Sequence, residues 1–373
     1  MNNIVCYTLN KQNIKLGNMV YLNSNQSDKI EREINILLSP DNNYICHCAV
    51  VMSSILLNCD KSSSINFYIT DGGISTKNKE YLKLLNNIRP FSIFFIDISK
   101  YDLSMFPLNR KHIKVPTTYH RLLVPDILPV GIDKIIYLDC DVIVEKDLKE
   151  LFDIDLGDNL IAAVEDESAL QNCIRLDLDF YFNYGVILFN IKKLREFDLF
   201  DKCLSYFYKS KGMITLQDQD ILNGVLSDKC LHLPLMWNAS TPIFKEEIWK
   251  QKTSIHEKIV AGLEPGIIHF TYTPKPWNKK CGHILRDEYY KYLRVADFEK
   301  YKKYVNNKKF DNLFNVKKSN KHVIFILFGM KIKIPRKSKK RIMQDNLLDM
   351  QYRLVEINSK LDKLSSAFNC DKN

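Results

Sequence analysis

The chain has 373 residues, of which 46% are hydrophobic and 26% are charged, a balance typical of soluble globular proteins. With only 12 glycines and 12 prolines, it is poor in long flexible linkers, and its length suits one large domain or two moderate ones. The net charge of +10 comes entirely from residues 316–341, which hold ten lysines or arginines and no acidic residue. Because the rest of the chain is neutral and this segment contains the apolar run "VIFILF", its charge favours an anionic membrane surface over nucleic acid as a partner.

The ten cysteines contain no CxxC pair, and the start of the chain has neither a basic region nor a long apolar region. We therefore expect no signal peptide and reduced thiols in the cytoplasm. The sequence Cys46-His47-Cys48 resembles a set of metal ligands, but its apolar neighbours predict a buried helix, which favours core residues. The longest aliphatic and aromatic run, residues 323–328, is far shorter than the roughly 20 residues that span a bilayer.

After a polar extension over residues 1–31, the predicted elements alternate between strands and helices. Strands over 33–39 and 65–70 enclose a helix over 44–58, which indicates a βαβ nucleotide-binding arrangement. A strand over 91–97 and a helix over 117–128 come next. Further strands are expected over 135–144, 159–166, 182–191 and 266–272. This alternation predicts an α/β fold.

Asp139 and Asp141 interrupt the apolar run "YLDCDVIV" at residues 137–144. In a strand, residues two apart leave the backbone on the same side, so the two carboxylates should lie close together. Like charges at close range raise each other's pKa unless a cation lies between them. Other polar residues near predicted strand ends, where ligands bind in open α/β sheets, are Asp41, Asp71, Asp166 and His269.

An Asp-x-Asp sequence at a strand end has three interpretations. The aspartates can cap a loop, or the first can be the nucleophile of a haloacid-dehalogenase-type phosphatase. That phosphatase motif usually ends the first strand of its domain and has Thr or Val two residues after the second aspartate, where this chain has Ile143. In the third interpretation both carboxylates bind a divalent cation together with a nucleotide diphosphate, because hard oxygen ligands suit Mg²⁺ or Mn²⁺.

Seven motifs follow one another along residues 33–285: "PDNNY", "ITDGGIS", "FPLNRKHIKVPTTYHRL", "YLDCDVIV", "YFNYGVILFN", "LQDQDILNG" and "HFTYTPKPW". In this order they closely resemble glycosyltransferase family 8. Members of that family are retaining enzymes that include bacterial lipopolysaccharide galactosyl- and glucosyltransferases. The resemblance implies a GT-A, Rossmann-like nucleotide-sugar-binding domain over residues 32–285, with a mixed, mainly parallel sheet.

The resemblance also implies a metal site. Asp139 and Asp141 would hold Mn²⁺, with Mg²⁺ as the alternative, and His269 would be the third protein ligand. An imidazole among carboxylates suits Mn²⁺ better than Mg²⁺. Lys275 would contact the diphosphate as a fixed positive charge.

The resemblance further implies positions for the nucleotide and the sugar. Asp41 and Asn43 match residues that hold uracil and ribose, and Thr118 would line the same pocket. The residues that match positions around the donor sugar and its acceptor are Arg121, Asp166, Asn183, Asp218 and Gln219. An amide such as that of Gln219 is a poor nucleophile, which favours front-side attack by the acceptor hydroxyl over a covalent intermediate.

Two residues depart from the family pattern. Tyr184 follows Asn183 where the family prefers a small residue, and Tyr272 replaces the glycine usual in the "HFxGxxKPW" motif. Glycine lets the backbone approach phosphates closely, so Tyr272 is expected to reshape that loop. Both changes bear on sugar and acceptor preference rather than on cation or UDP binding.

The resemblance ends near residue 285. We expect a helical linker over 286–315, and then a membrane-docking segment over 316–341, for which a solvated strand pair is the alternative. From Met343 to Phe368, apolar residues recur at alternating spacings of four and three, which indicates a coiled-coil heptad seam. The helical tail over 342–373 would pair two copies into a homodimer or dock on its own domain.

The sequence therefore predicts a cytoplasmic glycosyltransferase, peripheral on the inner face of the cytoplasmic membrane. Its expected donor is UDP-galactose or UDP-glucose, and its expected acceptor is a lipid-linked saccharide such as a lipopolysaccharide core. Two rival hypotheses are a phosphohydrolase of the Asp-x-Asp type and a non-catalytic, membrane-associated coiled-coil scaffold. A scaffold would have a degraded site, whereas Asp139, Asp141, Gln219, His269 and Lys275 are all present.

Overall fold

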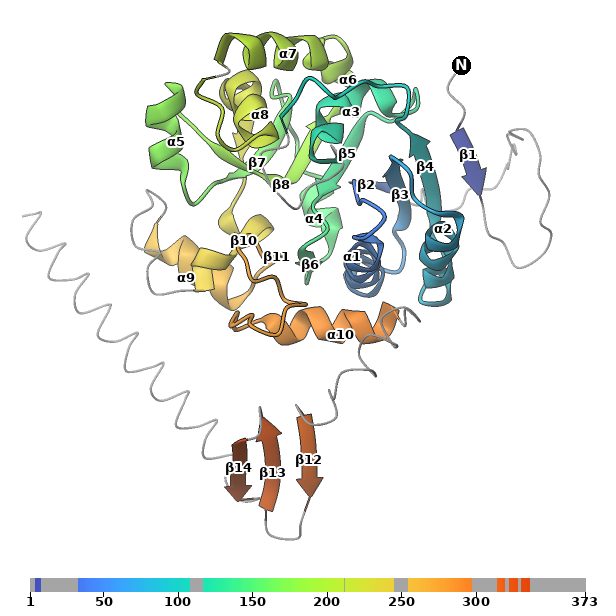
Figure 1. Cartoon of the computed structure of the whole chain (residues 1–373), viewed down its shortest axis with the longest axis vertical. Coiled ribbons are helices and arrows are strands. Elements are labelled where there is room, and N and C mark those ends of the chain that lie inside the picture. The colour runs from blue at the N-terminus through green and yellow to red at the C-terminus, as the bar shows by residue number, and fades with distance from the viewer. Residues whose placement is uncertain are drawn as a thin grey trace, which may run out of the picture. The chain divides into compact units, whose positions relative to one another are not determined.

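The computed structural model describes residues 4–7, 33–107, 117–210, 212–244, 254–296, 314–318, 322–327 and 330–335. The chain divides into two compact units, Met1–Phe298 and Glu299–Asn373 (Figure 1). No helix in the described ranges is long and apolar enough to cross a membrane.

The first unit is built on a mixed sheet that has eight strands in the described part of the chain, in the order β1-β4-β3-β2-β5-β8-β7-β9. The central strands β2, β3, β4 and β5 run parallel, while β8 runs antiparallel to β5 and β7. Because both sheet faces are covered, the central strands are almost continuously apolar. The strand bounds are Ile4–Tyr7 (β1), Glu33–Leu38 (β2), Ser64–Asp71 (β3), Ser92–Asp97 (β4), Lys134–Leu138 (β5), Ile161–Glu165 (β7), Phe182–Asn190 (β8) and Cys230–His232 (β9).

The strand expected over 135–144 is broken at the two aspartates, so that prediction is wrong in one respect. β5 ends at Leu138, and β6 (Val142–Val144) belongs to a second small sheet with β10 (Ala239–Ser240) and β11 (Ile267–His269). β6 pairs antiparallel with β11, whereas β5 pairs with β2 and β8. The two halves of the apolar run have different partner strands, and an apolar pattern alone does not specify partners.

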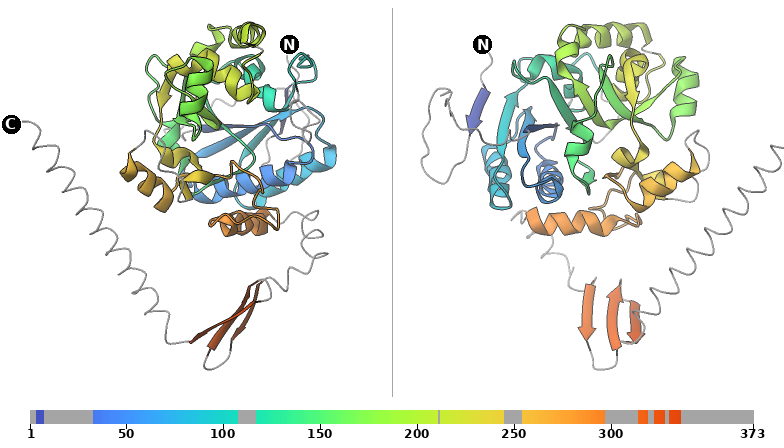
Figure 2. Two further views of the ribbon diagram at one scale, coloured as in Figure 1. Left: turned by 60° about the vertical axis from the view of Figure 1, so that its left-hand side comes forward. Right: turned by 180° about the vertical axis from the view of Figure 1, so that it is seen from behind.

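Helices cover both faces of the sheet. Figures 1 and 2 show α1 and α10 on one side and α7 and α8 on the other. The helix bounds are Ile45–Asn58 (α1), Thr76–Lys83 (α2), Val124–Ile127 (α3), Leu148–Phe152 (α4), Ala169–Leu176 (α5), Ile191–Arg195 (α6), Leu199–Ser210 (α7), Asp218–Leu226 (α8), Ile255–Leu263 (α9) and Arg286–Ala296 (α10). Short 3₁₀ helices span Leu84–Asn87, Thr117–Leu123, Ser227–Lys229, Leu235–Asn238 and Thr241–Phe244.

The single helix expected over 117–128 is instead a 3₁₀ helix followed by α3. Pro125 lies in the first turn of α3. Proline has no N–H to donate and suits the start of a helix, so an uninterrupted α-helix through this position is disfavoured. The consequence is a tight, buried segment in which Tyr119, Leu122 and Leu123 join the core beneath β5 and β8.

On the opposite face, α1 is buried along almost its whole length, including Cys46, His47 and Cys48. This confirms that these three residues belong to the core. Nδ1 of His47 lies 2.8 Å from the hydroxyl of Tyr289 on α10, and α10 packs against α1. The first part of the expected linker over 286–315 is thus packed within the first unit, against α1.

In the second unit, β12 (Phe314–Lys318), β13 (His322–Leu327) and β14 (Met330–Pro335) form an antiparallel sheet. These strands fall mostly within the segment that we expect to dock on a membrane. The heptad seam over 343–368 and most of the N-terminal extension lie outside the described residues.

Candidate active site

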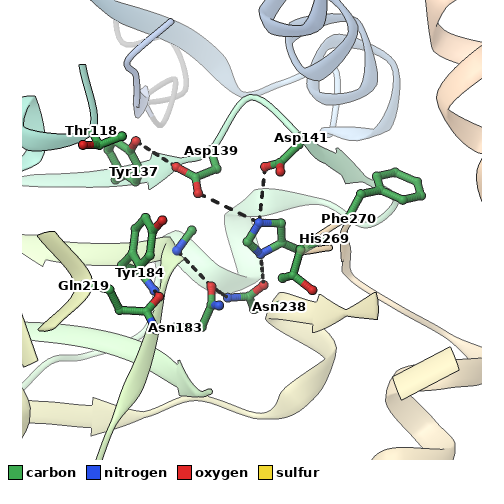
Figure 3. Close-up of polar contacts among 12 residues, drawn as sticks. Thr118, Tyr137, Asp139, Asp141, Asn183, Tyr184, Gln219, Asn238, His269 and Phe270 are labelled. Atoms are coloured by element: carbon green, nitrogen blue, oxygen red, sulfur yellow. Dashed lines mark hydrogen bonds and ion pairs between the residues drawn. The ribbon is translucent and has the colours of Figure 1, made fainter. Parts of the chain in front are cut away.

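Asp139, Asp141 and His269 converge where the two sheets of the first unit meet (Figure 3). The aspartates lie in the turn between β5 and β6, and His269 ends β11, which is paired with β6. Nε2 of His269 is 3.3 Å from Asp141 Oδ1 and 3.9 Å from Asp139 Oδ2. One ligand atom from each residue lies within 4.8 Å of the other two, so this triad can hold a divalent metal ion.

A chain of amides fixes the orientation of His269. An aspartate carboxylate only accepts, so Asp166 Oδ2 must receive the Nδ2 hydrogen of Asn183, at 2.8 Å. Asn183 Oδ1 in turn accepts from Asn238 Nδ2 at 2.9 Å, and Asn238 Oδ1 lies 2.8 Å from His269 Nδ1. Nδ1 of His269 is therefore the donor in this contact, and Nε2 faces the aspartates. In metal sites, a ligating histidine typically donates a hydrogen bond from the ring nitrogen that does not bind the metal.

Arg121 is a buried cation that contacts the aspartate Asp139 of the triad. It is only 3% exposed and its guanidinium donates to Asp139 Oδ1 at 3.0 Å, while Nε lies 3.0 Å from Asp218 Oδ2. Tyr137 and Tyr184 pack on the guanidinium, with its central carbon 4.5 and 4.1 Å from their ring centres. Burial alone would lower the pKa of Arg121, but the surrounding groups, Asp139 foremost among them, together outweigh it and the pKa is raised. Arg121 stays a cation and fixes the position of Asp139.

Lys275 is the second cation at the site. Its Nζ lies 2.5 Å from Asp141 Oδ2 and donates to the backbone carbonyl of Thr271 at 3.1 Å. Burial by itself would raise the pKa of Asp141, but neighbouring Lys275 and His269 hold it well below its usual range. Asp141 therefore remains an anionic oxygen ligand at any physiological pH.

A cavity of about 250 Å³ opens beside the two aspartates. Its walls include Asp41, Thr118 and Tyr184 together with Asp139 and Asp141. The hydroxyl of Thr118 is buried and has no hydrogen-bond partner among the described residues. Asp41 Oδ1 accepts from the backbone N–H of Asn43 at 2.6 Å, but Asn43 itself is exposed and does not line the cavity.

Gln219, in the first turn of α8, lies on the other side of Tyr184 from the metal triad (Figure 3). Its Nε2 donates to Asp166 Oδ2 and to the Tyr181 hydroxyl, both at 3.2 Å, and its Oε1 accepts from the backbone N–H of Tyr184 at 3.4 Å. The amide is buried and held at both ends. The fold thus brings together, beside the metal triad, the side chains of Asp166, Asn183, Asp218 and Gln219.

Comparison with known proteins decides the family. The sequence model of glycosyl transferase family 8 matches residues 35–281, about two thirds of the chain. The chain belongs to glycosyltransferase family 8. It is 30% identical over 270 residues to general stress protein A of Bacillus subtilis, covering 70% of this chain and 93% of that protein. It is 28% identical over 252 residues to the lipopolysaccharide 1,2-glucosyltransferase of Escherichia coli K12, covering 66% of this chain and 73% of that protein.

Among solved structures, the galactosyltransferase LgtC in complex with donor and acceptor sugar analogs matches with a TM-score of 0.65 and 28% identity. The match covers 72% of this chain and 99% of LgtC. The first unit therefore has the GT-A fold, and the chain is a glycosyltransferase. The Asp-x-Asp phosphohydrolase and the non-catalytic scaffold are disfavoured by the same family match.

Two residues that shape the site of this family 8 glycosyltransferase were not expected from its sequence. Asn238 orients His269, but nothing in the sequence around it signals that role. Gly185 follows Tyr184 in β8, and a Cβ built on it would lie 2.2 Å from Cε1 of His269. Only glycine fits there. A glycine inside an apolar strand often marks a place where another group approaches the backbone closely, so the sequence contained a signal for this contact.

One strand-end aspartate is not part of the site. Asp71 Oδ1 accepts from the backbone N–H groups of Gly73 and Ile74 at 3.0 and 2.7 Å, and its carboxylate pairs with Lys79. It caps the loop after β3 and does not line the cavity. Position at a strand end therefore does not by itself identify a site residue.

Proposed function

We propose that this family 8 enzyme moves galactose or glucose from UDP-galactose or UDP-glucose to a saccharide acceptor, with retention of configuration. The acceptor in this proposal is lipid-linked, such as a lipopolysaccharide core. The observation that carries the proposal is the Asp139–Asp141–His269 triad, whose two aspartates line the 250 Å³ cavity. The names of two similar proteins, a lipopolysaccharide glucosyltransferase and a galactosyltransferase, support the choice of sugar and acceptor.

The metal in this proposal is Mn²⁺, because two carboxylates and an imidazole suit it better than Mg²⁺, which remains the alternative. When bound, the ion would act as a Lewis acid that stabilises charge developing on the diphosphate. Arg121 holds Asp139 in place, and the Asn238 amide keeps His269 in the ligating tautomer. Lys275, 2.5 Å from Asp141, would add a fixed positive charge next to the diphosphate.

Asp41 and Thr118 would bind the uracil and ribose from the cavity wall. Asn43, which does not line the cavity but donates its backbone N–H to Asp41, would assist them. On the sugar side, Gln219 would lie against the anomeric carbon, and Asp166, Asn183 and Asp218 would position the donor and acceptor. Because both ends of the Gln219 amide are engaged, its oxygen is poorly placed to attack. The acceptor oxygen would bond to the anomeric carbon as the sugar–phosphate bond breaks, and the acceptor proton would pass to the departing phosphate oxygen.

The direct test is hydrolysis of UDP-sugars in the absence of an acceptor. We expect Mn²⁺-dependent release of UDP from UDP-galactose or UDP-glucose, abolished by EDTA and restored by added Mn²⁺. Coupled detection of UDP would measure it. Hydrolysis of p-nitrophenyl phosphate with no effect of UDP would support the phosphohydrolase instead, and the absence of both activities would support the scaffold.

We also propose that the enzyme is cytoplasmic and docks on the inner face of the cytoplasmic membrane through residues 316–341. This segment carries all of the excess positive charge. Near an anionic leaflet each lysine or arginine contributes about 1 kcal/mol, so partial engagement of the segment would hold the enzyme at the surface. The heptad seam over 343–368 would pair two copies and strengthen binding by avidity.

Truncation after Phe298, at the boundary between the two units, tests the membrane role. We expect the truncated protein to keep its Mn²⁺-dependent UDP-sugar hydrolysis, to lose binding to anionic vesicles and to become monomeric. Vesicle co-sedimentation over a salt series and light scattering would measure these changes. Truncated protein that still sediments with vesicles, or full-length binding that does not respond to salt, would contradict membrane docking by this segment.

A further inference from the structure

Tyr184 is a large side chain at the end of the nucleotide cavity where the sugar of the donor would lie. It forms part of the cavity wall together with Asp139 and Asp141. Figure 3 shows its ring between the metal triad and Gln219. In the proposed reaction the diphosphate lies at the metal, and the anomeric carbon lies against Gln219. The donor sugar joins these two points, so it must lie beside Tyr184.

The alternation of side chains along β8 sets the direction of the Tyr184 ring. Successive residues of a strand point to opposite sides. Asn183 belongs to the chain of amides behind His269, and a Cβ built on Gly185 would meet the His269 ring. Tyr184 lies between these two residues in the strand, so its side chain leaves β8 on the other side. There it packs on Arg121 and borders the cavity.

Arg121 holds the ring of Tyr184 in place. The central carbon of the guanidinium lies 4.1 Å from the ring centre. The guanidinium also donates to the backbone carbonyl of Tyr184 and to Asp139 Oδ1, both at 3.0 Å. Arg121 is almost fully buried, and cation–π contacts are strongest where water is excluded. Because a ring that swung away would lose this contact, Tyr184 forms a fixed wall of the cavity.

Gln219 is the second fixed group beside the sugar. Its Oε1 accepts from the backbone N–H of Tyr184 at 3.4 Å, and its Nε2 donates to Asp166 Oδ2 at 3.2 Å. Since neither Gln219 nor Tyr184 can give way without losing the contacts that hold it, the space between them and the metal has a set size. The C2 atom of a sugar is bonded to the anomeric carbon, so the group on C2 is confined to this space.

We propose that Tyr184 is a specificity-determining residue that admits donor sugars with a hydroxyl on C2, such as glucose and galactose, and excludes 2-acetamido sugars. The C–H groups of the admitted sugar pack against the aromatic ring, whereas the acetyl group of a 2-acetamido sugar collides with it. The family prefers a small residue at this position, so the selection is a property of this chain. This inference rests on the proposed transfer reaction and narrows the class of donor.

The test compares donors in pairs, by hydrolysis in the absence of an acceptor. The pairs are UDP-glucose with UDP-N-acetylglucosamine, and UDP-galactose with UDP-N-acetylgalactosamine. We expect the wild-type protein to favour the hydroxyl donor of the pair that it uses by about 100-fold or more in kcat/KM, since a rigid wall opposes the larger group. In Tyr184→Ala this ratio should fall about 10- to 100-fold, because the wall is removed.

Three further variants separate the ring from its surroundings. Tyr184→Phe keeps the ring and should keep the selectivity. Tyr184→Leu removes the ring but still covers Arg121, so it should have an intermediate ratio and carries the test if Tyr184→Ala does not fold. Tyr208→Ala removes a tyrosine that is 59% exposed on α7 and should leave the ratio unchanged. UDP contains no sugar donor group, so its affinity, measured by calorimetry with Mn²⁺, should stay close to the wild-type value in all four variants.

Wild-type protein that hydrolyses no UDP-sugar would contradict the proposed function itself. Other outcomes would overturn only the role of Tyr184. One is a wild-type protein that uses the 2-acetamido donors as well as the hydroxyl donors, or better. Another is a ratio that does not change in Tyr184→Ala and Tyr184→Leu, or an equal fall for both donors of a pair, which would indicate a purely structural role. Loss of selectivity in Tyr184→Phe would show that the ring is not the wall.

Discussion

Asp141→Asn and Asp139→Asn should each reduce transfer by about a thousandfold or more. Each change removes one anionic oxygen from the triad in which His269 Nε2 lies 3.3 Å from Asp141 and 3.9 Å from Asp139. Loss of metal stabilisation of the departing UDP is worth several kcal/mol, and each 1.4 kcal/mol is a factor of ten in rate. Initial rates of UDP release over a Mn²⁺ series would measure the effect.

The two variants should differ in stability. Asp139 pairs with the buried Arg121, whereas Asp141 pairs with the more accessible Lys275. Removing one partner of a buried pair leaves an uncompensated charge and is strongly destabilising, so Asp139→Asn should have the lower melting temperature. Part of that cost is relieved because Arg121 also contacts Asp218.

A weaker variant and a control complete this series. Asn238→Ala removes the hydrogen-bond partner of His269 and should weaken Mn²⁺ binding about 10- to 100-fold. Asp228→Asn, at an exposed position, should change neither the transfer rate nor Mn²⁺ binding. Near-normal transfer by either triad variant in saturating Mn²⁺ would show that the metal assignment is wrong.

Gln219→Ala and Lys275→Ala should separate chemistry from nucleotide binding. Gln219 is buried among Asp166, Tyr181 and the backbone of Tyr184, on the sugar side of the site, so its loss should lower turnover about 100-fold or more and leave UDP affinity nearly unchanged. Lys275 lies beside Asp141, where the diphosphate would bind, so its loss should weaken UDP binding as well. Calorimetry with UDP and Mn²⁺, together with donor hydrolysis rates, would measure both quantities.

Gln171→Ala and Lys279→Ala change the same residue types at exposed positions and serve as controls. Equal UDP affinity in Gln219→Ala and Lys275→Ala would contradict this division of roles. A large loss of UDP affinity in Gln219→Ala alone would place Gln219 in the nucleotide site instead.

The sequence by itself determined the fold class and located the three residues that can hold a metal ion. The spacing of hydrophobic residues and the local composition predicted α1 and five strands, because these elements are strongly apolar. The predicted bounds agree within a few residues with those observed for α1, β2, β3, β4, β7 and β8. The order of seven short motifs identified the family, which the family match then confirmed. Those motifs also located the Asp139–Asp141–His269 triad, since each ligand lies in a conspicuous local pattern.

Only the tertiary structure decided how that site is supported. The apolar run around Asp139 contains two strands rather than one, because its halves pair with different strands, and pairing between distant segments leaves no local mark. The contact between the Asn238 amide and His269 and the close approach of Gly185 to His269 join residues more than 25 positions apart in the chain. Hydrogen bonds and steric contacts act over a few ångströms in space, so these roles exist only once the strands have come together.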